Sequence, residues 1–357
     1  RLRAALSEKN SARKHPHRMG AWAADSKSHV AHMAAGDFYG SEKSATVANA
    51  GSLKITFHGK DGSAVVLKEK TAVKAGEIVD AAVMSRKALA AFIGEQIADA
   101  KAQGVLFSLH LKATMMKVSD PIMFGVAVNE FYKDVLAKHA DALAKVGFDA
   151  NNGIGDLYAR LDKLDAATRD AIEADLKAEY AKRPALAMVN SDKGITHRDV
   201  PSDGSVDAAM AAMIRDSGGM WSAEGKLQDA KAVIPDRSDA GVYQAVIEDC
   251  IAHGAFDPST MGSVPNVGLM AQKAEQYGPH DKTSEITEDG VAHILDIATG
   301  EEPMSQHVEQ GDIWPMSQAK DAPIRDWAHP AVTRARHPCT PAVIWLAPHR
   351  PPDAAPI

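Results

Sequence analysis

Alternation of apolar and polar residues predicts a β-hairpin in the first quarter of the chain. Apolar and polar residues alternate over 53–57, the run KDGS follows at 60–63, and a second apolar run occupies 64–67. A period of two is typical of strands with one buried face, and Asp-Gly is a turn sequence. Residues 1–50 show no clean period, so we expect loops with short helices there.

After the predicted hairpin, apolar residues recur with the spacing of an α-helix. Ser85 is placed to cap a helix whose apolar run stops near Gly104. Four apolar residues share one face of this helix: Leu89, Phe92, Ile93 and Ile97. The short apolar run at 105–109 predicts a buried strand, and a second helix is predicted over 126–145, with Gly147 past its end.

The middle of the chain repeats a strand and helix pattern. Charged residues over 156–183 predict one or two exposed helices, and apolar runs at 186–189 and 232–234 predict strands. A helix is predicted from about 241 to 253, closed by Gly254. Strands that alternate with helices indicate an α/β fold, with a mixed, largely parallel sheet covered by helices on both faces.

The last part of the chain is rich in β patterns and proline. Residues 283–312 predict strands with a turn near Gly300, and the apolar run at 342–346 predicts another strand. Seven of the 18 prolines follow His329, a density that we expect to exclude helices and central strands. We therefore expect an irregular, Pro-rich tail over 347–357.

At 357 residues the chain is long enough for two domains or for one large α/β domain. A weak break at Pro184 separates residues 1–184, which hold the hairpin, from residues 185–346. We expect these segments to be the two halves of one large domain, followed by the tail at 347–357. The first residue is not Met, and the chain ends soon after an apparent strand, which indicates a piece of a longer sequence.

Charge and cysteine content narrow the class of protein. A formal net charge of −7, from 47 acidic and 40 basic residues, argues against a general nucleic-acid binder. Cys250 and Cys339 have no CxxC spacing, which fits a reducing compartment. The chain has neither an apolar run of about 20 residues nor a signal-peptide core, so we expect a cytoplasmic protein without a membrane partner.

The segment HLKATMMKVSDPIMFG, at 110–125, is the strongest candidate for a site loop. It follows the strand predicted at 105–109 and mixes Lys, Asp, Met and Pro without periodicity. Lys112 would therefore stand just past the carboxyl end of a strand, where open α/β sheets place their active sites. A lysine there binds a carboxylate, or acts as a base when desolvation lowers its pKa. A solvated lysine at a sheet edge fits the same pattern.

Two other residues have a chemical and a structural interpretation. Asp207 falls in the first turns of a predicted helix, which Ser202 or Asp203 would cap, and its carboxylate suits Mg²⁺ or Mn²⁺. Asp is also common at helix starts because it favours the helix dipole, and Asp216 is a competing ligand. Tyr277 ends another predicted helix, where its hydroxyl protonates a carbanion or simply forms a hydrogen bond.

A set of segments from about residue 3 to residue 346 resembles the central part of the monomeric NADP-dependent isocitrate dehydrogenases. The segments are ARKHPHRMGAW, ADSKSHVAHM, GDFYGSEK, HLKATMMKVSDPIMFG, NNGIGDLYAR, MVNSDKGIT, MIRDSG, VIEDC, GAFDP and TMGSVPNVGLMAQKAEQYG. The resemblance implies an isocitrate/isopropylmalate dehydrogenase-like large domain, truncated here because the chain has about half the family's length. The missing parts would lie at both ends.

The resemblance also implies roles for particular residues. Lys112 matches the lysine that contacts isocitrate and takes part in proton transfer at its hydroxyl. Asp207 matches a metal-binding aspartate, and Tyr277 matches the tyrosine that contacts substrate and protonates the enolate after carbon dioxide leaves. Of the family's paired arginines, one matches Arg3, while the substrate-binding one falls on a leucine, so that Arg1 is its possible substitute.

The implied activity is metal-dependent oxidative decarboxylation of isocitrate with reduction of NADP, by a monomer that uses Mg²⁺ or Mn²⁺ and serves the tricarboxylic acid cycle and glyoxylate bypass. By the same resemblance, two further metal aspartates and most NADP contacts belong to segments absent here. We therefore expect the isolated chain to be inactive. The alternatives are a non-catalytic fragment with an anion- or metal-binding cleft, and a different metal-dependent decarboxylating enzyme.

Overall fold

The computed structural model describes residues 6–16, 18–111, 116, 118–190, 195–196, 207–257, 282–336, 341–344 and 346–357. The helices are α1 (Leu6–Lys14), α2 (Phe38–Ser41), α3 (Arg86–Gln103), α4 (Ser119–Phe131), α5 (Lys133–Lys138), α6 (Ala140–Val146), the 3-10 helix η1 (Ala150–Asn152), α7 (Ile154–Leu161), α8 (Ala166–Lys182), α9 (Asp207–Arg215), α10 (Arg237–His253), α11 (Asp321–Arg336) and α12 (Pro351–Ala354). The strands are β1 (His29–Ala31), β2 (Lys43–Thr46), β3 (Gly51–Gly59), β4 (Ala64–Val73), β5 (Ile78–Ala81), β6 (Leu106–Leu109), β7 (Met188–Asn190), β8 (Ile195–Thr196), β9 (Gly219–Trp221), β10 (Leu227–Val233), β11 (Thr283–Glu285), β12 (Gly290–Asp296), β13 (Met304–Val308) and β14 (Ile313–Ala319).

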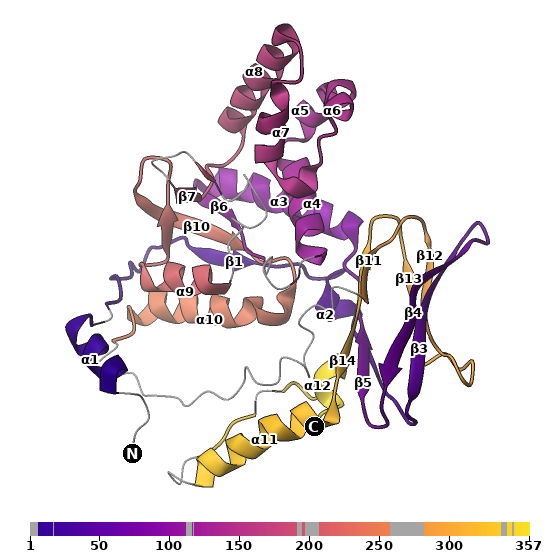
Figure 1. The fold of residues 1–357 in the computed structure, drawn as a ribbon. Helices are drawn as coiled ribbons and strands as arrows, with labels where there is room; N and C mark the ends of the chain where they lie inside the picture. Colours follow the sequence, from indigo (N-terminus) through magenta and orange to yellow (C-terminus); the bar gives the residue numbers. More distant parts are fainter. Residues whose placement is uncertain are drawn as a thin grey trace.

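A small parallel sheet lies at the centre of one half of the molecule. Its strands run in the order β1, β10, β6, and β9 pairs antiparallel with β10. The predicted covering of both faces is confirmed (Figure 1). Phe107 and Leu109 pack with the core of α3 and α4, whereas Leu106 packs with α9 and α10 on the opposite face.

Two antiparallel sheets make the other half. One has the order β11, β14, β5, β2 and the other β13, β12, β3, β4 (Figure 1). Both sheets contribute to a single apolar cluster that includes the buried Trp314. The hairpin predicted from 53–67 is confirmed as β3 and β4. The expectation of a largely parallel sheet is wrong, because parallel pairing between named strands of the described chain is confined to β1, β10 and β6. A mixed α/β fold is nevertheless present.

The capping residues of α3 act as the sequence predicts. The Ser85 side chain accepts a hydrogen bond from the Ala88 N–H at 3.3 Å, and Gly104 ends the helix in the left-handed conformation, with φ 69°. The strand that follows, β6, is buried along its whole length. Gly254, another glycine predicted to end a helix, ends α10, but that helix begins at Arg237, four residues before the predicted start.

The helix predicted over 126–145 is three helices instead. It begins earlier, at Ser119, and bends at Tyr132 and His139. Both residues contact α8: the Tyr132 hydroxyl lies 2.7 Å from that of Tyr180, and His139 Nε2 lies 2.6 Å from the Asp175 carboxylate. These contacts between elements distant in sequence explain why one helical period becomes α4, α5 and α6.

Both ends of the chain differ from the sequence expectations. The first 50 residues contain strands β1 and β2 in addition to short helices. No strand occurs among the described residues of 341–346, where Val343 is 86% exposed. Helix α11 continues through Pro330, and α12 is a short helix within 347–357. A largely exposed helix tolerates the proline because water can bind the carbonyl that loses its partner.

Candidate functional site

The carboxyl ends of the three parallel strands meet at one edge of their sheet. Ala31 of β1, Val233 of β10 and Leu109 of β6 are in register. The pairing continues one residue further, since the Ile234 N–H donates to the Ala31 carbonyl and the His110 N–H donates to the Val233 carbonyl. The loop predicted to carry chemistry therefore leaves the sheet at its carboxyl edge, as expected for an α/β site.

Polar side chains are buried at both ends of that loop. His110 is 4% exposed, and Asp120, in the first turn of α4, is fully buried. Lys112 itself lies outside the described residues. We call the segment between Leu111 and Val118 the lysine loop, and the structure describes the residues at its two ends. The sequence analysis gave neither His110 nor Asp120 a role. The only signal was their place in a polar run beside a buried strand.

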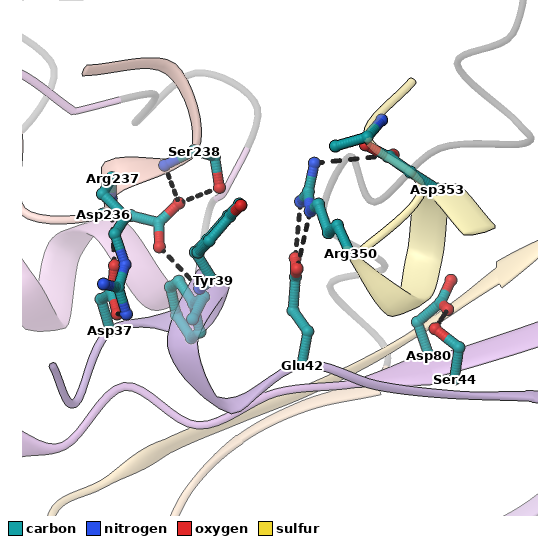
Figure 2. A network of polar contacts seen from close by, with 12 residues as sticks. Asp37, Tyr39, Glu42, Ser44, Asp80, Asp236, Arg237, Ser238, Arg350 and Asp353 are labelled. Atoms are coloured by element: carbon teal, nitrogen blue, oxygen red, sulfur yellow. Dashed lines mark hydrogen bonds and ion pairs between the residues drawn. The ribbon is translucent and has the colours of Figure 1, made fainter. Parts of the chain in front are cut away.

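A second polar group lies at the same edge, after β10 (Figure 2). Asp236 caps α10, and its carboxylate also accepts a hydrogen bond from the Tyr39 N–H at 2.9 Å. The next residue, Arg237, donates from Nη2 to Asp37 Oδ1 at 3.0 Å, and its backbone N–H donates to the other oxygen of Asp37. Asp37 is fully buried and caps α2. These bonds tie α2 to the start of α10.

Tyr39 joins this group to the end of the chain (Figure 2). The guanidinium carbons of Arg237 and Arg350 lie 5.2 and 5.3 Å from the centre of its ring, within the range of cation–π attraction. Arg350 in turn donates to both carboxylate oxygens of Glu42, from Nε at 2.7 Å and from Nη2 at 2.6 Å. Such a bidentate pair holds the segment that leads into α12 against α2 and β2.

Burial changes the acidity of three carboxyl groups in this network. It raises the pKa of Asp236 and of Glu42, against the hydrogen bonds that favour their ionised forms. Burial also raises the pKa of Asp80 to about 6, although the Ser44 hydroxyl donates to it. The network therefore contains a carboxyl group that exchanges a proton near neutral pH.

A pocket of about 440 Å³ lies next to this network but away from the lysine loop. It is lined by Glu42, Lys43, Ser44, Glu302, Pro303, Met304, Ser305 and Pro351. These residues belong to the antiparallel half and to α12. Because Lys112 follows the parallel strand β6 in the sequence, we place the candidate site at the carboxyl edge of the parallel sheet rather than in this pocket.

The predicted metal ligand is only partly described. Asp207 is the first residue of α9, as the sequence predicts, but its side chain lies outside the described part. The competing ligand Asp216 is 3.4 Å from Arg215 Nε at the other end of that helix. Within the described ranges, no group of three or more His, Cys, Asp or Glu side chains is arranged to hold a metal ion. A single carboxylate at 207 suits Mg²⁺ or Mn²⁺ chemically and needs further oxygen ligands.

The other predicted site residues are outside the described part of the chain. These are Lys112, Tyr277, Arg1 and Arg3. Their roles therefore stay predictions. Among the described helices, none is long and apolar enough to cross a membrane.

Comparison with known proteins identifies the family. The sequence model of the monomeric isocitrate dehydrogenases matches residues 1–357. The chain belongs to this family. It is 67% identical over 352 residues to the NADP isocitrate dehydrogenase of Azotobacter vinelandii, an alignment that covers 99% of this chain and 47% of that protein.

Two further relatives carry the same family name. The chain is 56% identical to NADP isocitrate dehydrogenase 2 of Colwellia maris and 53% identical to NADP isocitrate dehydrogenase 2 of Mycobacterium tuberculosis. In both cases 98% of this chain and 47% of the relative are covered. The chain thus spans about half the length of the curated isocitrate dehydrogenases that it matches, and the resemblance seen in its sequence is confirmed.

Proposed function

We propose that the protein contributes to the metal-dependent oxidative decarboxylation of isocitrate to 2-oxoglutarate, with reduction of NADP. The observation that carries this proposal is the 67% identity to an NADP isocitrate dehydrogenase over almost the whole chain. The position of the lysine loop at the carboxyl edge of a parallel sheet supports it, because that edge is where α/β enzymes bind substrates.

The reaction needs three contributions from the chain's own residues. Lys112 takes part in removing the proton of the substrate hydroxyl, and Tyr277 returns a proton to the enolate after decarboxylation. Asp207 contributes a carboxylate ligand for Mg²⁺ or Mn²⁺. When bound, the ion would supply Lewis-acid stabilisation of the developing negative charge, and NADP would be the hydride acceptor.

We also propose that these 357 residues hold only part of the complete site. By the family resemblance, two further metal aspartates and most NADP contacts lie elsewhere in the longer relatives. Arg3, or Arg1 in place of the expected arginine, would contribute to substrate binding. The isolated chain should therefore bind isocitrate with a metal ion without turning it over at a family-like rate.

Calorimetry with isocitrate and Mn²⁺ tests this proposal. We expect binding by the wild type, and a loss of about tenfold or more in affinity for Lys112→Ala and Asp207→Ala, since each removes a direct contact. Lys133→Ala is the matched control, because Lys133 lies on α5 with a 56% exposed side chain. Absence of binding by the folded wild type, or equal binding by all variants, would refute the proposed site.

The same samples separate the alternatives. NADPH formation from isocitrate at a family-like rate would contradict the proposal of an incomplete site. Stronger binding or turnover of another 2-hydroxy acid would instead favour a different decarboxylating enzyme.

The proposed setting is a cytoplasmic monomer whose partner is isocitrate. The family's name, the net charge of −7 and the small number of cysteines support this proposal. Light scattering of the purified chain tests the monomeric state, and a dimer at micromolar concentration would contradict it.

A further inference from the structure

Two histidines lie next to each other on the second antiparallel sheet, far in sequence from the candidate site. His58 of β3 pairs with Val291, and His293 of β12 pairs with Thr56, so the two histidines are diagonal neighbours on adjacent strands. Ala292 and Ile294, which flank His293, are fully buried in the core. Because side chains alternate along a strand, His293 faces away from that core.

The ring of His293 is held by a carboxylate. Its Nδ1 lies 2.7 Å from Glu302 Oε2. A carboxylate has no proton to donate, so in this contact it accepts the hydrogen bond. His293 Nδ1 therefore carries the shared proton, which leaves Nε2 with a lone pair in the neutral ring. Metal-binding histidines are commonly oriented in this way by a carboxylate.

The separation of the two rings fits coordination of one ion. The ring centroids of His58 and His293 are 4.6 Å apart, with an interplanar angle of 44°. A metal–nitrogen bond of about 2.0–2.1 Å places each centroid roughly 3.2 Å from the ion. Two centroids 4.6 Å apart then subtend about 90° at the ion. This is the angle between neighbouring ligands in tetragonal Ni²⁺ and Cu²⁺ complexes, whereas tetrahedral Zn²⁺ prefers a wider one.

We propose that His58 and His293 form a bis-histidine site for Ni²⁺ or Cu²⁺, with Glu302 as the positioning residue for His293. Two imidazole ligands favour these ions over Mg²⁺, which prefers oxygen ligands. Water completes the coordination, since no set of three His, Cys, Asp or Glu ligands occurs in the described ranges. The site is separate from the Mg²⁺ or Mn²⁺ ligand proposed at Asp207.

Calorimetric titration of the untagged protein with NiCl₂ tests the inference. We expect one Ni²⁺ per chain to bind at this site, with affinity reduced about tenfold or more in His58→Ala and in His293→Ala. Glu302→Gln should weaken binding by about tenfold, the usual effect of losing an orienting carboxylate. Millimolar Mg²⁺ should not displace the Ni²⁺.

Two control variants make the result specific. His253→Ala removes an exposed histidine on α10, in the half of the molecule that holds the parallel sheet, and should leave the affinity unchanged. Asp207→Asn should also leave it unchanged, which separates this site from the proposed isocitrate site. Circular dichroism checks that each variant is folded. The inference is wrong if the wild type does not bind Ni²⁺, or if the His58 and His293 variants bind it as well as the His253 variant does.

Discussion

The parallel sheet and the antiparallel sheets differ in where they place polar side chains. In the parallel sheet, β1, β10 and β6 all end at one edge, and the residues that follow include His110, Asp236 and the lysine loop. In the antiparallel sheets, neighbouring strands end at opposite edges, and polar residues such as His58 and His293 lie on the face away from the core. Parallel pairing therefore concentrates loops from distant parts of the sequence at one edge, which is where this family's substrate lysine is expected.

The two halves meet at α2, and each contributes one ion pair there (Figure 2). Asp37 pairs with Arg237 at the edge of the parallel sheet, and Glu42 pairs with Arg350 beside β2. If the edge of the parallel sheet depends on this junction, breaking the first pair should have the largest effect.

Asp37→Ala should lower the free energy of unfolding by about 3–5 kcal/mol. The substitution removes a fully buried carboxylate that caps α2 and leaves the guanidinium of Arg237, 28% exposed, without its ion pair. Urea denaturation followed by circular dichroism measures the change.

Asp249→Ala is the matched control for that prediction. Asp249 pairs with His253 on the surface of α10, with both side chains largely exposed, and its loss should cost less than about 1 kcal/mol. Equal effects of the two substitutions would show that the junction contributes no more than a surface ion pair.

The next effect, in the antiparallel half, depends on pH. Burial raises the pKa of Asp80 from 3.8 to about 6. Between pH 3.8 and about 6 the Asp80 carboxyl group binds its proton more tightly in the folded state than in the unfolded state. Protonation of Asp80 therefore stabilises the fold at low pH, and this contribution is lost as pH rises through about 6. Asp80→Asn removes this dependence. Relative to the variant, the wild type should lose on the order of 3 kcal/mol between about pH 4 and 7.

Asp289→Asn provides a control of opposite sign. A hydrogen bond from the Gln310 N–H, with Lys60 nearby, lowers the pKa of Asp289. Its contribution is therefore present above the unfolded pKa and is lost as pH falls, so the wild type should gain stability relative to this variant as pH rises. Denaturation curves at several pH values measure both differences. For each residue, the quantity of interest is the difference in stability between wild type and variant as a function of pH. If this difference changed in the same direction for Asp80 and for Asp289, the raised pKa assigned to Asp80 would be wrong.

The sequence predicted the elements whose boundaries depend on nearby residues. Ser85 and Gly104 delimit α3 as expected, and the strand that carries the lysine loop follows directly. The strand directions and β1 were missed because they depend on distant partners: β1 pairs with β10, some 200 residues later. The Asp37–Arg237 pair spans the same separation. The site prediction is thus supported in its placement of the lysine loop, while the chemistry of Lys112, Asp207 and Tyr277 stays a prediction.

The smallest predicted effect tests whether the conformational preference of single residues determines where α3 and α10 form. These helices cover opposite faces of the parallel sheet. Gly104 ends α3 with φ 69°, and Gly241 lies inside α10. A Cβ at either position would meet no atom within 4 Å, so packing does not distinguish the two sites. Backbone conformation alone therefore predicts opposite results for the same substitution.

Gly104→Ala should cost about 1 kcal/mol, because alanine is strained in the left-handed conformation. Gly241→Ala should stabilise the protein by about 0.5–1 kcal/mol, because alanine loses less backbone entropy in a helix. Denaturation midpoints of the two variants and the wild type, measured under the same conditions, show whether each substitution stabilises or destabilises the protein. If both substitutions shift the midpoint in the same direction, the end of α3 is set by its packing against β6 and α4, and the success of the local prediction there was coincidental.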